Sequence, residues 1–68
     1  MTHRERLAVR LKRLRKARHH MTQAELAKRA GLTRGYIARL ETGRHDPALS
    51  TLEKLAKALR VNVAELLK

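Results

Sequence analysis

The sequence predicts a compact all-α domain of five short helices, and three observations lead to that prediction. Apolar residues make up 43% of the 68 residues and are mostly Leu and Ala, while Phe, Trp and Cys are absent and Tyr36 is the only aromatic residue. This composition favours helices over a sheet. Apolar residues recur at helical spacing, and capping or turn residues separate the segments. This length allows one small core, so we expect a single domain over residues 1–68.

The first helix is expected over about residues 4–18. Arg and Lys fill most of its positions, and its apolar residues recur every three or four positions: Leu7, Ala8, Leu11, Leu14 and Ala17. This pattern is typical of an amphipathic helix. His19, His20 and Met21 interrupt the pattern and are expected to form a loop.

The second and third helices have clear start and stop residues. Thr22 and Glu25 have the spacing of a capping box, in which hydroxyl and carboxylate each accept a hydrogen bond from the backbone. Gly31 is a natural left-handed stop for the second helix. Thr33 caps a third helix that is expected to run to about Thr42.

Two further helices follow the Pro-containing loop around Pro47. Ser50 and Glu53 predict another capping box at the start of the fourth helix. Asn62, again with a glutamate three residues later at Glu65, is expected to cap a short last helix. The five predicted helices and their short connections are consistent with one all-helical core.

The positive charge is concentrated at one end of the chain. The formal net charge is +11, and residues 1–20 alone contain eight Lys and Arg but only one Glu. Such a field predicts a polyanionic partner and fast, salt-sensitive association. The alternative is a solvated basic face that only keeps the protein in solution. Charge alone does not distinguish DNA, RNA and anionic membrane.

A membrane location is not expected. No apolar run approaches the roughly 20 residues of a membrane-spanning helix, and no apolar segment of a secretory signal follows the charged start. The basic first helix could lie on anionic lipid, but the core of so small a domain needs its apolar face. We therefore expect a soluble, cytoplasmic protein.

The middle of the chain has the spacing of two short helices that meet at a steep angle. Ala27 is small where the second helix must approach closely, and Gly31 makes the tight turn. Ile37 and Leu40 can then pack back across the angle. These are the requirements of a helix-turn-helix, whose second helix enters the major groove.

Several segments resemble one known family in register. Residues 22–33, 37–44 and 52–59, together with Pro47, are similar to the phage repressor/Cro-like helix-turn-helix family of transcriptional regulators. The resemblance extends from about residue 7 to 67. It implies a five-helix, lambda-repressor-like DNA-binding domain with its helix-turn-helix at about 22–42. It also implies a protein encoded by a prokaryote or a phage.

The resemblance also implies which residues would contact double-stranded DNA. The start and exposed face of the third helix would read base edges, through Thr33, Arg34, Gly35 and Arg39. A guanidinium can bind O6 and N7 of guanine with two hydrogen bonds. The start of the second helix, Tyr36 and the loop after the third helix would contact phosphates, through Thr22, Gln23, Tyr36, Arg44 and His45. Tyr36 could alternatively fill the core.

Two features depart from the common family pattern. Gly35 stands where relatives often present a reading side chain, and a helical glycine lowers stability by about 1 kcal/mol relative to Ala. The loop at residues 19–21 is one residue longer than the commonest form. With that allowance, Arg15 aligns with a family arginine that pairs with the glutamate at Glu41. We therefore expect an Arg15–Glu41 ion pair between the first and third helices.

The sequence gives no support for an enzyme, a cofactor or a metal site. Capping accounts for three of the six acidic residues and the ion pair for a fourth, so we expect no pair of carboxylates for acid–base work. Ser50 has no nucleophile elbow around it. The histidines lack the spacing of a ligand set on one helix: His3, His19, His20 and His45.

The expected function is a sequence-specific transcriptional regulator, most simply a repressor that binds a palindromic operator as a homodimer. The last helix would supply the dimer interface, through Val63, Leu66 and Leu67; these residues could instead only complete the core. An alternative is a DNA-binding antitoxin or adaptor whose main role is to bind a partner protein. Another is a nucleic-acid coating protein with no sequence preference.

Overall fold

The structure is a computed structural model that describes residues 1–68, and it confirms the all-α prediction. It contains five helices and no strand: α1 (His3–Ala17), α2 (Gln23–Ala30), α3 (Arg34–Leu40), α4 (Leu49–Leu59) and α5 (Val63–Leu67). The first helix begins and ends one residue earlier than expected. The third ends at Leu40 rather than near Thr42, because the backbone leaves the helix at Glu41 and Thr42.

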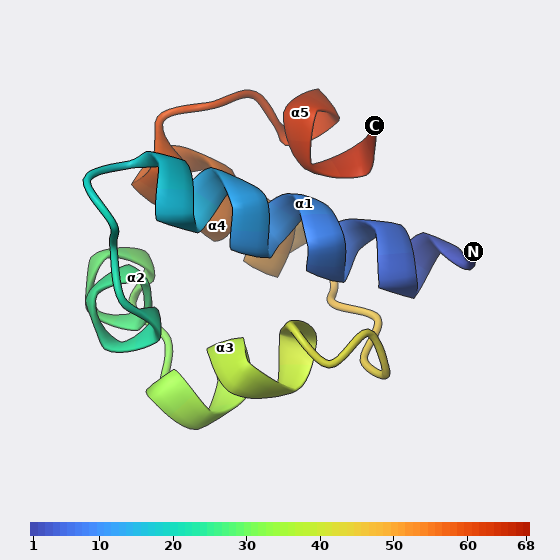
Figure 1. Ribbon diagram of the computed structural model, residues 1–68, viewed down its shortest axis with the longest axis horizontal. Helices are drawn as coiled ribbons and strands as arrows, with labels where there is room; N and C mark the ends of the chain where they lie inside the picture. Colours follow the sequence, from blue (N-terminus) through green and yellow to red (C-terminus); the bar gives the residue numbers. More distant parts are fainter.

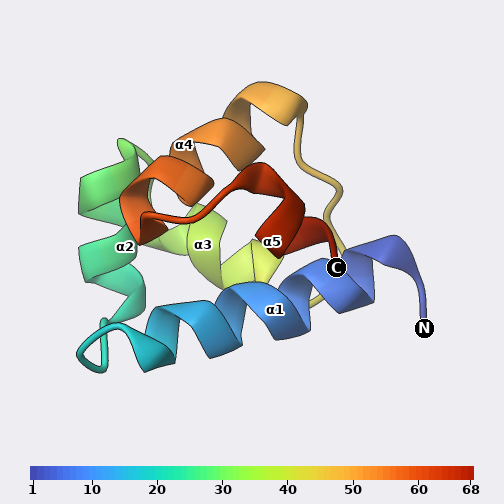
Figure 2. The ribbon, with the colours of Figure 1, turned by 90° about the horizontal axis from the view of Figure 1, so that it is seen from above.

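The longest helix, α1, lies between two groups of shorter ones. In Figure 1, α2 and α3 lie below α1, α5 lies above it and α4 runs behind it. The view from above in Figure 2 shows α2 across the carboxyl-terminal end of α1, with α5 above the space between α1 and α4. The pair α2–α3 is therefore on the side of the molecule opposite α5.

Every helix contributes at least one fully buried side chain to a single core. The largest such side chains are Leu11, Leu26, Ile37, Leu40, Leu55, Leu59 and Leu66. Leu66 was expected at a dimer interface, but its exposed fraction is 0% because α5 packs against α1 and α4. Leu66 is thus a core residue of its own chain, and it does not contribute to an outer surface.

Three helices begin with the side-chain caps that their sequences indicate. Thr22 accepts a hydrogen bond from the backbone of Glu25 at 3.0 Å, and the Glu25 carboxylate accepts one from the Thr22 backbone at 3.1 Å. Thr33 caps α3 through the backbone N–H of Tyr36 at 3.1 Å. An equivalent capping box, which sequence reasoning missed, joins Thr2 and Glu5 at the start of α1.

The other two predicted caps are not formed as expected. Helix α4 begins at Leu49 with Ala48 as its N-cap, so Ser50 already lies inside the helix and makes no capping bond with Glu53. Asn62 is at the N-cap of α5, but its side chain makes no capping bond. Glu65 instead pairs with Arg10 on α1 and with Lys68.

Candidate nucleic-acid interface

The tight turn between α2 and α3 depends on Gly31. Its backbone is left-handed, with φ of 70°, and its N–H points to the carbonyl oxygens of Ala27 and Lys28. The next residue, Leu32, also donates its N–H to the Ala27 carbonyl oxygen at 2.8 Å. These bonds end α2 and turn the chain directly into α3, as the helix-turn-helix spacing predicted.

Helix α3 has one buried face and one exposed face. Ile37 and Leu40 are fully buried, and they fix the helix against the core. The four residues expected to read bases are all exposed: Thr33, Arg34, Gly35 and Arg39. Neither Arg34 nor Arg39 makes a side-chain ion pair in the structure, so both guanidinium groups are available to a partner.

The residues expected to contact phosphates lie on both sides of α3. Thr22 and Gln23 are at the start of α2, whereas Arg44 and His45 are in the loop after α3. The His45 ring contacts Tyr36 edge-on, with Nε2 3.2 Å from the Tyr36 hydroxyl oxygen. Tyr36 is half-buried and packs against the core, and its contact with a phosphate stays a prediction.

A groove beside the start of α2 brings together cationic and polar side chains from three helices. Lys16 comes from α1, Gln23 from α2 and Arg34 from α3, and His20 from the loop lines the same groove. An anion in this groove would meet positive charge from two directions, close to the free backbone N–H groups of α2. The sequence analysis did not select Lys16 and His20 as candidates, because they are distant from α3 in the sequence.

The predicted ion pair between Arg15 and Glu41 is present and holds the interface together from behind. Arg15 Nε and Nη2 donate to the two carboxylate oxygens of Glu41 at 2.7 and 2.9 Å. Arg15 Nη1 donates to the carbonyl oxygen of Met21 at 2.7 Å, and Gln23 Nε2 donates to Glu41 Oε1 at 3.0 Å. One network therefore connects α1, the following loop, the start of α2 and the end of α3.

This network determines the charge state of the buried carboxylate. Burial by itself would raise the pKa of Glu41, but the hydrogen bonds from Arg15 and Gln23 and the nearby positive charges outweigh burial and lower that pKa below its ordinary value. Glu41 thus stays ionised at neutral pH. The side-chain amide of Gln23 donates one of its two hydrogens to Glu41. Its other hydrogen and its carbonyl oxygen are therefore available to a partner.

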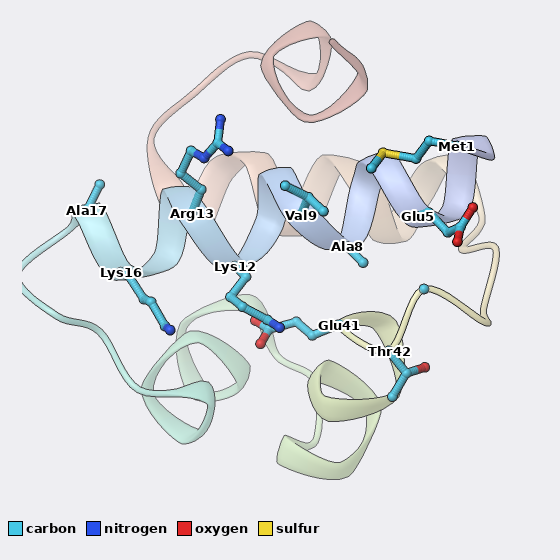
Figure 3. A pocket seen from close by; sticks show the side chains of 11 residues that line it. Met1, Glu5, Ala8, Val9, Lys12, Arg13, Lys16, Ala17, Glu41 and Thr42 are labelled. Atoms are coloured by element: carbon cyan, nitrogen blue, oxygen red, sulfur yellow. The ribbon is translucent and has the colours of Figure 1, made fainter.

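A second groove runs between α1 and the end of α3, as shown in Figure 3. Ala8 and Val9 lie on its α1 side and Thr42 on its α3 side, while Lys12 extends toward Glu41. No group of three or more His, Cys, Asp or Glu side chains is arranged to hold a metal ion. None of the helices has the length and apolar character needed to cross a membrane.

Comparison with known proteins gives matches over most of the chain. A helix-turn-helix family model matches residues 11–66. The immunity repressor protein of Bacillus phage phi105 is 47% identical over 55 residues, which are 81% of this chain and 38% of the repressor. The chain therefore spans well under half the length of that repressor. An uncharacterized HTH-type transcriptional regulator of Methanocaldococcus jannaschii is 37% identical over 51 residues, covering 75% of this chain and 77% of the regulator.

Solved structures have the same arrangement of helices. The restriction-modification controller protein C.AhdI from Aeromonas hydrophila superposes with a TM-score of 0.87 at 35% identity, covering 93% of this chain and 94% of the controller. The hypothetical transcription factor NHTF from Neisseria gives a TM-score of 0.92 at 37% identity, covering 98% and 76% of the two chains. These relatives are named as regulators, which are not enzymes.

Proposed function

This chain belongs to the helix-turn-helix family of transcriptional regulators, and we propose that it is a sequence-specific repressor that binds a palindromic operator as a homodimer. Family members of this kind bind double-stranded DNA. The single observation that carries the proposal is the exposed face of α3, which presents two unpaired guanidinium groups on a helix fixed firmly from behind.

Arg34 and Arg39 are the proposed base readers. Both are exposed on a helix whose opposite face is anchored by Ile37 and Leu40. A helix fits the major groove, and a guanidinium there can bind O6 and N7 of guanine together. Thr33 would contribute its methyl group to a thymine or its hydroxyl to a phosphate.

Phosphate contacts on both sides of α3 would fix its orientation in the groove. Gln23 and Thr22 would bind one strand at the start of α2, and Arg44 and His45 would bind the other after α3, with the Tyr36 hydroxyl close by. Such contacts supply affinity and register but no sequence information.

The dimer and the repressor role are supported by the surface of α5 and by the relatives. Leu67 is 56% exposed and Val63 is partly exposed, so α5 retains apolar surface after Leu66 has entered the core. A two-fold dimer that reads a palindromic operator needs its two α3 helices about one helical turn of DNA apart. The phage relative is named an immunity repressor, which favours repression over activation.

In vitro selection of bound duplexes from a random pool tests this function. We expect an inverted repeat with half-sites about one turn apart, bound roughly 10³-fold or more tightly than random DNA at the same salt concentration. Arg34→Ala should weaken binding to the selected duplex by about 1–3 kcal/mol and relax the preference at one base pair.

Gln23→Ala is the matched control, because it should weaken binding to all duplexes about equally. Equal loss on all sequences for Arg34→Ala would instead assign Arg34 to the phosphate backbone. Selection that recovers no preferred duplex would refute sequence-specific repression and favour a coating protein without sequence preference.

A further inference from the structure

Gly35 lies at the centre of the exposed face of α3. Successive residues of an α-helix are about 100° apart around the axis, which places Gly35 nearly opposite the buried pair Ile37 and Leu40. Arg39 follows one turn later on the same face, and Arg34 flanks it on one side. The part of α3 that would enter the groove deepest therefore has no side chain.

The fold itself does not require a glycine at this position. Gly31 and Gly43 have φ of 70° and 80°, which other residues rarely adopt, and a Cβ on Gly43 would also lie 3.4 Å from the backbone of Glu5. Gly35 has ordinary helical geometry, and a Cβ there would meet nothing within 4 Å. Since glycine is a poorer helix former than alanine, its presence at residue 35 weakens α3 without relieving any strain or clash.

From this contrast we propose that DNA imposes the glycine: the α3 backbone approaches the base edges directly at Gly35, and this sets the depth at which Arg34 and Arg39 reach their bases. The inference rests on the proposed DNA-binding function. A helix with its side chains is about 10–12 Å across and the major groove is about 12 Å wide. Removing the side chain on the leading edge is therefore a direct way to seat the helix deeper. Gly35 is then a specificity-determining residue through its missing Cβ.

The test is a pair of substitutions, Gly35→Ala and Gly35→Leu, both to good helix formers. Affinities are measured on the duplex selected with the wild-type protein and on a scrambled duplex at one salt concentration. We expect Gly35→Ala to bind the selected duplex about 10-fold more weakly and Gly35→Leu more weakly still, with binding to scrambled DNA within about twofold of wild type. The melting temperature of Gly35→Ala should rise by about 4 °C.

Ala17→Leu serves as the control, because Ala17 is exposed at the end of α1 and points away from α2 and α3 in Figure 3. It should leave both affinities unchanged. The inference would be overturned if the wild-type protein prefers the selected duplex and Gly35→Ala binds that duplex as tightly as wild type does. The proposed function would then stand. A lower melting temperature for Gly35→Ala would show that the fold needs the glycine, and would overturn the inference equally. Absence of a preferred duplex for the wild-type protein would count against the proposed function itself.

Discussion

The α2–α3 pair and the α4–α5 pair are held in place by different kinds of interaction. Both α2 and α3 begin with a threonine cap, and the ion pair of Arg15 with Glu41 connects them to α1. Neither α4 nor α5 has a side-chain cap. Partly buried bonds from Arg10 to Glu65 connect α5 to α1, and the remaining contribution of the two helices is apolar, from the leucines that they bury. Charge-assisted hydrogen bonds fix distance and angle, whereas apolar burial is not directional. The half that carries the proposed DNA contacts is therefore the half with side-chain caps and a buried ion-pair network.

The largest expected effect comes from removing the buried carboxylate. Glu41→Ala should lower the free energy of unfolding by about 3–5 kcal/mol, because it leaves the Arg15 guanidinium buried without its partner. Urea or thermal unfolding followed by circular dichroism measures the change. The exposed Glu53, which makes no ion pair, is the matched control.

Glu53→Ala should change the free energy of unfolding by no more than about 0.5 kcal/mol. If Glu41→Ala lowers the free energy of unfolding by an equally small amount, the buried ion pair does not stabilise the α2–α3 half as argued above.

Acid should remove part of the same stabilisation. The pKa of Glu41 is lowered in the folded protein, so its contribution is complete above the ordinary glutamate pKa of about 4.5 and is lost as the pH falls through the lower folded value. Melting temperatures measured from pH 7 to pH 3 should fall below about pH 5. NMR titration of the Glu41 carboxyl carbon tests the assignment directly: a midpoint at or above 4.5 would contradict the network as the cause.

A smaller difference is expected between two hydroxyl residues near helix starts. Thr22→Ala should lower the free energy of unfolding by about 1 kcal/mol, because Thr22 caps α2. Ser50→Ala should change it by less than about 0.5 kcal/mol, because Ser50 lies inside α4 and caps nothing. Chemical denaturation of both variants compares them, and equal losses would show that the cap geometry is not decisive.

Most of the fold follows from patterns within short stretches of sequence. Helical spacing of apolar residues and the caps at Thr22, Thr33 and Gly31 located the helix-turn-helix to within one or two residues. The ion pair of Arg15 with Glu41 came instead from the family resemblance. Its two residues are 26 positions apart in the chain, and capping motifs and helical spacing relate only residues that are a few positions apart.

The errors arose where packing between distant segments overrides a local signal. Ser50 and Glu53 have the spacing of a capping box, yet α4 starts two residues earlier, with Ala48 as its N-cap after the buried Pro47. Leu66 looked available for a dimer because the sequence does not show that α5 turns back onto α1, where Arg10 binds the carboxylate and the carbonyl oxygen of Glu65. The capping box of Thr2 with Glu5 is different: the spacing of these two residues indicates it in the sequence, and the prediction missed it.

The hydrogen bond from Gln23 to Glu41 has a consequence for how such a protein could evolve. Under the proposed function the rest of the Gln23 amide binds a phosphate, so this one side chain would contribute both to operator binding and to the stability of the domain. Variants that lose the Gln23–Glu41 hydrogen bond would dissociate from DNA faster. They would also be degraded faster, since cellular proteases act on the unfolded fraction. Under that proposal, substitutions on the outer face of α3 or at Arg44, which lie outside this network, would change operator occupancy with less effect on protein abundance.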